Sequence, residues 1–118
     1  MEEYLILMRL DLITKDAQPS PEQMQVYMKM YQDWVGGIAA QNKFAGGKGL
    51  STEGKVVKGS IITDGPFAET KESLAGFIIV RAESFEDALS IAKACPILKG
   101  DSNNSVEVRK VVSRHNKG

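Results

Sequence analysis

Two helix-start signals, set between short apolar runs, constrain this 118-residue chain more than any other feature of its sequence. At the first signal, Ser20 can cap a helix and Pro21 fits the first helical position, while Gln23 has the spacing of a capping box. Apolar side chains then recur at helical spacing, which predicts one broad buried stripe and a helix end near Gln41. The stripe consists of Met24, Tyr27, Met28, Tyr31, Trp34, Val35 and Ile38.

The second signal lies at Ser84, where two acidic residues follow in the turn that a helix dipole makes favourable for negative charge. This predicts a helix from Ser84 to about Cys95, because Pro96 cannot continue it. Its expected buried face is Ala88, Leu89, Ile91, Ala92 and Cys95.

Apolar runs around and between the helices predict strands at Tyr4–Leu10, Lys48–Leu50, Lys55–Thr63, Leu74–Ala82 and residues 106–112. The order β-α-β-β-β-α-β fits an antiparallel-rich α+β sandwich of the split βαβ kind. Both helices then cover one face of the sheet. The other face needs a cover of its own, and a second copy of the chain is the expected one.

Composition excludes several classes of protein. The 15 basic and 15 acidic residues balance, which argues against nucleic-acid binding through overall charge. One cysteine, Cys95, and one histidine, His115, leave no set of residues for a disulfide, a multi-cysteine metal site or a histidine triad. No apolar run is long enough to cross a membrane, and the acidic start is unlike a signal peptide. We therefore expect one cytoplasmic domain over residues 1–118, with a polar tail at 113–118, no cofactor and no membrane partner.

The densest polar cluster is the segment DGPFAETKE at residues 64–72, which separates two strands by more than a hairpin turn needs. Three interpretations stay open: a loop shaped for structural reasons, the rim of a small-ligand pocket, or an acid–base pair of carboxylates. The acid–base candidates are Asp64, Glu69 and Glu72, and their spacing matches no calcium-loop pattern. The candidate pocket residues are Asp64, Gly65, Pro66, Phe67, Glu69 and Thr70.

Three further residues outside this segment are candidates for ligand binding. Arg9 and Arg109 lie in predicted strands, where they could hold an anion or pair with Glu107 or Asp64. Trp34 in the first helix is an aromatic candidate, although its spacing equally fits the core. Cys95 is expected to be a buried, inert thiol, because a helix C-terminus raises rather than lowers a thiol pKa.

DGPFAETKE, followed by LAGF at residues 74–77, resembles the signature of the DGPF-type branch of the YCII-related family. The segments SFEDAL at residues 84–89 and VEVR at residues 106–109 resemble that family's second helix and closing strand. The resemblance covers essentially the whole chain. It implies a ferredoxin-like α+β fold in a bacterial protein, and a homodimer whose sheets face each other in a dimeric α/β-barrel-like assembly.

Better-studied relatives carry a histidine in the first helix and an aspartate just before a proline after the second helix, proposed as an acid–base pair. Here the matching helix segment reads PEQM at residues 21–24, and Cys95 precedes Pro96. We therefore expect a dimeric protein that binds a small anionic ligand without that pair. The alternatives are an isomerase, lyase or hydrolase that uses the loop carboxylates, and an interaction module linked to sigma-factor regulation, which rests on the resemblance alone.

Overall fold

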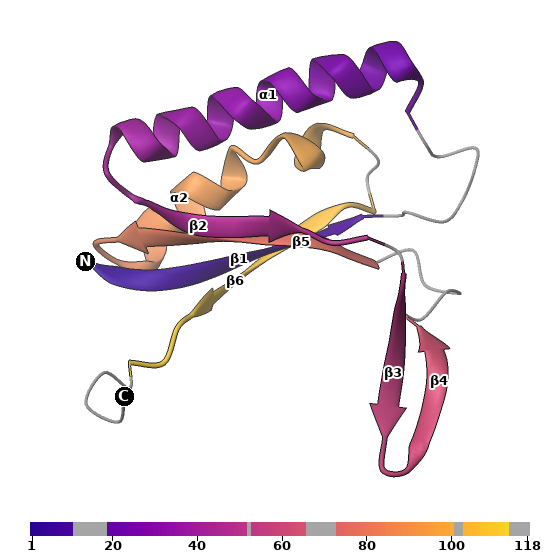
Figure 1. The fold of residues 1–118 in the computed structure, drawn as a ribbon. Helices are drawn as coiled ribbons and strands as arrows, with labels where there is room; N and C mark the ends of the chain where they lie inside the picture. The colour runs from indigo at the N-terminus through magenta and orange to yellow at the C-terminus, as the bar shows by residue number, and fades with distance from the viewer. Residues whose placement is uncertain (11–18, 52, 66–72, 101–102, 114–118) are drawn as a thin grey trace.

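The computed structural model describes residues 1–10, 19–51, 53–65, 73–100 and 103–113. Four antiparallel strands form the main sheet in the order β2-β5-β1-β6. They are β1 (Glu2–Leu10), β2 (Phe44–Gly49), β5 (Ser73–Ala82) and β6 (Ser105–Lys110). Helices α1 (Pro21–Ala40) and α2 (Phe85–Lys93) cover one face of this sheet (Figure 1). The chain is thus an α+β protein with the strand order of a ferredoxin-like split βαβ fold. No helix in the described ranges is both long and apolar enough to cross a membrane.

Both helix starts are confirmed at the level of single hydrogen bonds. The Ser20 hydroxyl accepts from the Gln23 backbone N–H at 3.2 Å, and the Gln23 side chain accepts from the Ser20 N–H at 2.8 Å. The Ser84 hydroxyl accepts from the Asp87 N–H at 3.1 Å. Helix α1 ends as predicted. Helix α2 ends two residues earlier than predicted, and a short 3-10 helix, η2 (Pro96–Lys99), follows.

The core lies between the main sheet and the helices. Alternate residues of the two central strands β1 and β5 point toward the helices and are almost fully buried, as the pleat requires. The buried set is Tyr4, Ile6, Met8, Ile38, Ile78, Val80, Ala82, Ala88, Ala92, Cys95 and Ile97.

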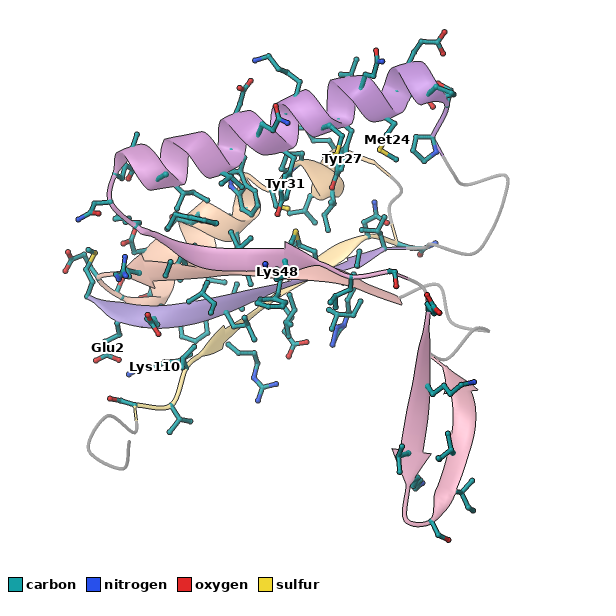
Figure 2. The ribbon with its side chains drawn as sticks, in the orientation of Figure 1. Glu2, Met24, Tyr27, Tyr31, Lys48 and Lys110 are labelled. Atoms are coloured by element: carbon teal, nitrogen blue, oxygen red, sulfur yellow. The ribbon has the colours of Figure 1, made fainter. Side chains whose placement is uncertain are left out.

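Helix α2 buries the face that its sequence predicts, with one correction: the Leu89 side chain is exposed. The predicted stripe of α1 is only partly correct, because Ile38 is its sole buried member and Met24 and Met28 are exposed. Figure 2 shows Tyr27 and Tyr31 pointing from α1 toward the sheet. These two rings are half-buried, because α1 packs mainly on η2 and β2 and covers the sheet loosely toward its own N-terminus.

The prediction of one strand over Lys55–Thr63 is wrong. This segment is a hairpin of β3 (Gly54–Lys58) and β4 (Ile61–Gly65), which pair only with each other. The chain reverses at the dipeptide Gly59-Ser60, where Gly59 adopts a φ of 63° that few other residues tolerate. The hairpin extends away from the main sheet on the side opposite the helices (Figure 1). The predicted short strand Lys48–Leu50 is the end of the longer β2.

Candidate functional site

The face of the main sheet that the helices leave uncovered has an apolar centre. Leu5 and Leu7 of β1 alternate with the buried core residues of that strand, and Phe77 and Ile79 of β5 stand opposite them. All four side chains are half-buried within one protomer. This surface, called the open face below, is therefore apolar at its middle.

Two arginines share one carboxylate on the open face. The Arg9 Nη2 atom lies 3.3 Å from Glu107 Oε1, and the Arg109 Nη1 atom lies 3.4 Å from Glu107 Oε2. The antiparallel register explains the meeting, because β6 places Glu107 opposite Leu7, between the levels of the two arginines. The structure thus brings together both predicted arginines, and it confirms Glu107 as their partner.

A third cation extends this positive region across the sheet. Lys48 on β2 is the register partner of Phe77. Phe77 is the partner of Leu7, and Leu7 is the partner of Glu107, so Lys48 and Glu107 lie in one row across the sheet. Its side chain is exposed on the edge strand (Figure 2). Glu107 thus pairs with two guanidinium groups, and the Lys48 ammonium group extends from the same row of the sheet.

Arg9 has an unsatisfied hydrogen-bond donor. Its Nη1 atom is shielded from solvent and has no hydrogen-bond acceptor among the described residues, although its Nη2 atom pairs with Glu107. A buried donor without an acceptor is costly, and more so when it carries charge. An anionic oxygen beside Arg9 would remove that cost.

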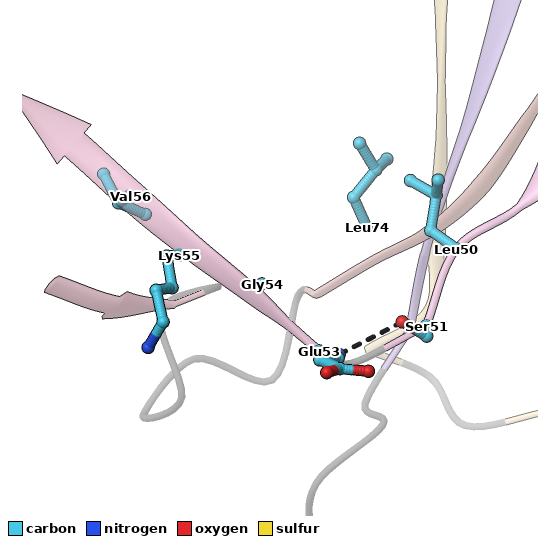
Figure 3. A pocket seen from close by; sticks show the side chains of 7 residues that line it. All are labelled: Leu50, Ser51, Glu53, Gly54, Lys55, Val56 and Leu74. Atoms are coloured by element: carbon cyan, nitrogen blue, oxygen red, sulfur yellow. Dashed lines mark hydrogen bonds between the residues drawn. The ribbon is translucent and has the colours of Figure 1, made fainter. Parts of the chain in front are cut away.

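A hollow of about 330 Å³ lies at the base of the hairpin (Figure 3). Leu74 lines it and is also the register partner of Arg9 across the β1–β5 pair. The Ser51 hydroxyl accepts from the Glu53 backbone N–H at 3.2 Å and shapes the turn that leads into β3. The complete lining is Leu50, Ser51, Glu53, Gly54, Lys55, Val56 and Leu74. An apolar surface with a few polar groups is typical of small-molecule sites.

The signature segment begins at the end of β4. The backbone of Asp64 pairs with Lys55 in the hairpin, and that of Gly65 pairs with Gly54, so both belong to β4 rather than to a loop. The Asp64 side chain lies outside the described part of the structure. The same holds for the predicted site residues Pro66, Phe67, Glu69, Thr70 and Glu72.

Trp34 is placed elsewhere. Its indole Nε1–H donates to the Ile91 carbonyl at 3.0 Å, and its ring packs against Tyr31 on the helix side of the sheet. The structure does not bring it to Arg9 and Arg109. Conversely, sequence reasoning missed the hollow. The only available signal was the glycine-rich stretch and the turn at Ser51–Gly54 that precede β3.

Comparison with known proteins identifies the family. A sequence model of the YCII-related domain matches residues 8–113. The chain belongs to the YCII-related family. It is similar to an uncharacterized protein of Rhizobium meliloti strain 1021, with 50% identity over 34 residues, which are 29% of this chain and 27% of that protein. Among solved structures it is similar to a 5-chloro-2-hydroxyhydroquinone dehydrochlorinase from Burkholderia phenoliruptrix AC1100, in complex with 2,5-dihydroxybenzoquinone. That match has 21% identity and a TM-score of 0.48, and it covers 96% of this chain and 97% of the other.

The displaced pKa values of this YCII-related chain lie away from neutrality. Burial raises the pKa of the Cys95 thiol to about 11, in agreement with the predicted inert cysteine, and burial raises the pKa of Tyr27 to about 12. Burial likewise raises the pKa of Tyr31, whereas a backbone N–H bond from Glu83 and the Lys43 ammonium lower that of Asp87. General acids and bases work best with pKa values near the working pH. The described ranges also contain no cluster of three metal-ligating side chains.

Proposed function

We propose that this chain binds a small organic anion on the open face, at Arg9 and the hollow at the base of the hairpin. The observation that carries the proposal is the shielded Arg9 Nη1 donor, which no described acceptor satisfies. Glu107 contacts Arg9 only through the Nη2 atom, and its other oxygen lies near Arg109, so the Nη1 donor is left without an acceptor in the described part of the chain. A ligand oxygen supplies the missing acceptor.

The chemistry of the site indicates a carboxylate or a phosphate as the anionic group. A guanidinium group is planar, always charged and matched to two oxygens of one anion. The hollow, which Leu74 links to Arg9 through the β1–β5 register, offers Leu50, Val56 and Leu74 to the apolar body of the ligand. The ligand class is therefore a small apolar molecule that carries one acidic group.

The proposal includes a homodimer of the DGPF-type branch. The branch is supported by the segment DGPFAETKE at residues 64–72. The dimer is supported by the open face, where Leu5, Leu7, Phe77 and Ile79 form an apolar centre that none of the described helices or strands covers. Burial of such a surface against a second copy is favourable by roughly 25 cal/mol per Å² of apolar area. The anion site then lies beside the contact between the two sheets.

Binding is tested by isothermal titration with inorganic phosphate, acetate and benzoate. Benzoate combines an acidic group with an apolar body and is expected to bind most tightly. Arg9→Gln keeps much of the side-chain volume but removes the charge, and it is expected to weaken benzoate binding at least tenfold. Lys29→Gln is the matched control, because Lys29 is exposed on α1 and pairs there with Asp33.

Two results would count against the anion site: no heat or thermal stabilisation with any of the three probes, or equal benzoate affinity in wild type and Arg9→Gln. Sedimentation equilibrium tests the dimer separately. A wild-type protein that sediments as a 12.9 kDa protomer at micromolar concentration would overturn the dimer.

A further inference from the structure

The hairpin β3–β4 exposes apolar side chains on both of its faces. Val57 and Ile62 are cross-strand partners on one face and are 66% and 63% exposed. Ile61 lies on the other face and is 64% exposed. Cross-strand pairs of β-branched residues stabilise hairpins mainly when they are packed against something. Within one protomer these three residues have little to pack against.

The hairpin also lacks support from the rest of its own protomer. Among the described elements, β3 and β4 pack chiefly against each other, whereas every strand of the main sheet packs against at least one further element. The hairpin extends away from the main sheet (Figure 1), and the protomer has a radius of gyration of 15.7 Å, where a compact chain of this size has roughly 13–14 Å. A two-stranded hairpin alone is marginally stable in water. It therefore needs a surface supplied from outside the protomer.

We propose that the hairpin is a dimerisation arm that packs its apolar side chains against the flank of a second copy of this chain. The inference rests on the proposed dimer and goes beyond it, because it assigns part of the contact to a segment outside the main sheet. The first argument is position: the hairpin extends from the same side of the sheet as the open face (Figure 1). Whatever covers the open face must also meet the hairpin.

The second argument is area. Four strands about 4.8 Å apart, paired over roughly six residues of about 3.3 Å each, give an open face of only about 400 Å². A stable interface of standard size buries about 800 Å² on each partner. The flat footprint of one sheet is therefore only about half of that figure, which leaves room for contact area from outside the sheet. Two reciprocal hairpins, related by the two-fold axis, add the area that is missing.

The third argument is reach. Packed sheets lie about 10 Å apart, whereas a five-residue strand extends about 17 Å. A hairpin that leaves the sheet toward the partner thus passes beyond the plane of the partner's sheet. Its apolar faces then lie beside the partner's flank and not in the gap between the sheets.

The first test is the double variant Val57→Lys with Ile62→Lys, which places two charges on one face of the hairpin. The dissociation constant of the dimer is expected to rise at least tenfold in sedimentation equilibrium, while the circular dichroism spectrum of the protomer is retained. Val26→Lys is the matched control, because Val26 is 61% exposed on α1, away from the open face. It is expected to leave the dissociation constant unchanged.

The second test does not require a variant that tolerates added charge. Ile61 is replaced by the photoreactive residue p-benzoylphenylalanine, and protein grown on light and heavy nitrogen is mixed before irradiation. Cross-linked peptides that join a light to a heavy chain are expected. A monomeric wild type would overturn the proposed dimer and the arm together. A dimeric wild type with an unchanged constant in the lysine variant, or with cross-links only within single chains, would overturn the arm alone.

Discussion

The helix-covered face of the main sheet and the hairpin are built from the same kinds of residue but differ fully in burial. In β5, Ile78 is 1% exposed and Val80 is completely buried. In the hairpin, Val57 is 66% exposed and Ile62 is 63% exposed. Both segments are short strands rich in β-branched side chains, and each has an antiparallel neighbour.

The comparison teaches that apolar composition determines strand formation but not what covers the strand. Helix α2 packs on the first segment, because the two βαβ crossovers return to the same side of the sheet. Among the described elements, none covers the exposed residues of the second segment. A protein whose apolar residues are covered in one region and exposed in another is expected to bury the exposed ones against a partner.

The largest expected effect is in the covered region. Ile78→Ala removes three carbons from a site with almost no exposure and leaves a cavity, so the free energy of unfolding should fall by about 4 kcal/mol. Urea denaturation followed by circular dichroism measures this change. Val26→Ala at an exposed position of α1 is the control, with an expected change within about 0.5 kcal/mol. Equal losses for the two variants would contradict the contrast in burial.

The second effect depends on pH and comes from the thiol beneath the helices. Cys95 is completely buried, and burial raises its pKa from 9.0 to about 11. The folded state therefore keeps the thiol protonated after the unfolded state begins to lose its proton. The stabilisation that the buried, protonated thiol gives to the folded state is fully present below pH 9. It is lost as the pH rises through about 11, and the total loss in the free energy of unfolding is about 3 kcal/mol. Urea titrations across this range measure the loss.

Cys95→Ala supplies the comparison for that pH series. Without the thiol, the free energy of unfolding should fall less steeply between pH 9 and pH 11, while Tyr27, whose pKa is also raised by burial, still contributes. Parallel curves for wild type and variant would show that the buried thiol does not couple folding to pH.

Local signals in the sequence predict the covered region well. The capping box at Ser20, the cap at Ser84 and the stop at Pro96 each depend on residues within a few positions of one another. Such short-range chemistry can be interpreted without knowing the tertiary structure. The pairing of Arg9 and Arg109 with Glu107 was also within reach, because an arginine in a strand normally finds a carboxylate.

The bare region was predicted less well. The prediction of one strand over Lys55–Thr63 followed the apolar pairs on either side of Gly59-Ser60, although a Gly-Ser dipeptide between two such pairs is itself a hairpin signal. The hollow at the base of the hairpin joins Leu50 and Leu74, which are distant in sequence and adjacent only through strand pairing. A bulge between Met8 and Arg9 sets the register that pairs Arg9 with Leu74, and no local feature of the sequence predicts this bulge.

The third effect tests how closely the covered sheet is packed at its edge. A Cβ atom added at Gly47 would lie 2.6 Å from the Phe77 carbonyl oxygen and 2.8 Å from Ile78 Cγ2, so Gly47→Ala should cost about 2 kcal/mol. Gly49 lies in the same strand with nothing within 4 Å of such an atom. Gly49→Ala is therefore expected to change the stability by less than about 0.5 kcal/mol. Urea denaturation compares the two, and equal costs would contradict the close packing of β2 on β5.

The smallest effect concerns the helix that covers the sheet most loosely. Ser20→Ala removes the hydroxyl that accepts from the Gln23 N–H, and it should lower the free energy of unfolding by about 1 kcal/mol. Ser90→Ala in the exposed middle of α2 is the matched control. It has no cap to lose and should be neutral or stabilising by about 0.5 kcal/mol, because alanine has the higher helix propensity. If Ser20→Ala leaves the free energy of unfolding unchanged, the first turn of α1 contributes little to the stability of the covered region. The start of α1 would then belong with the bare region.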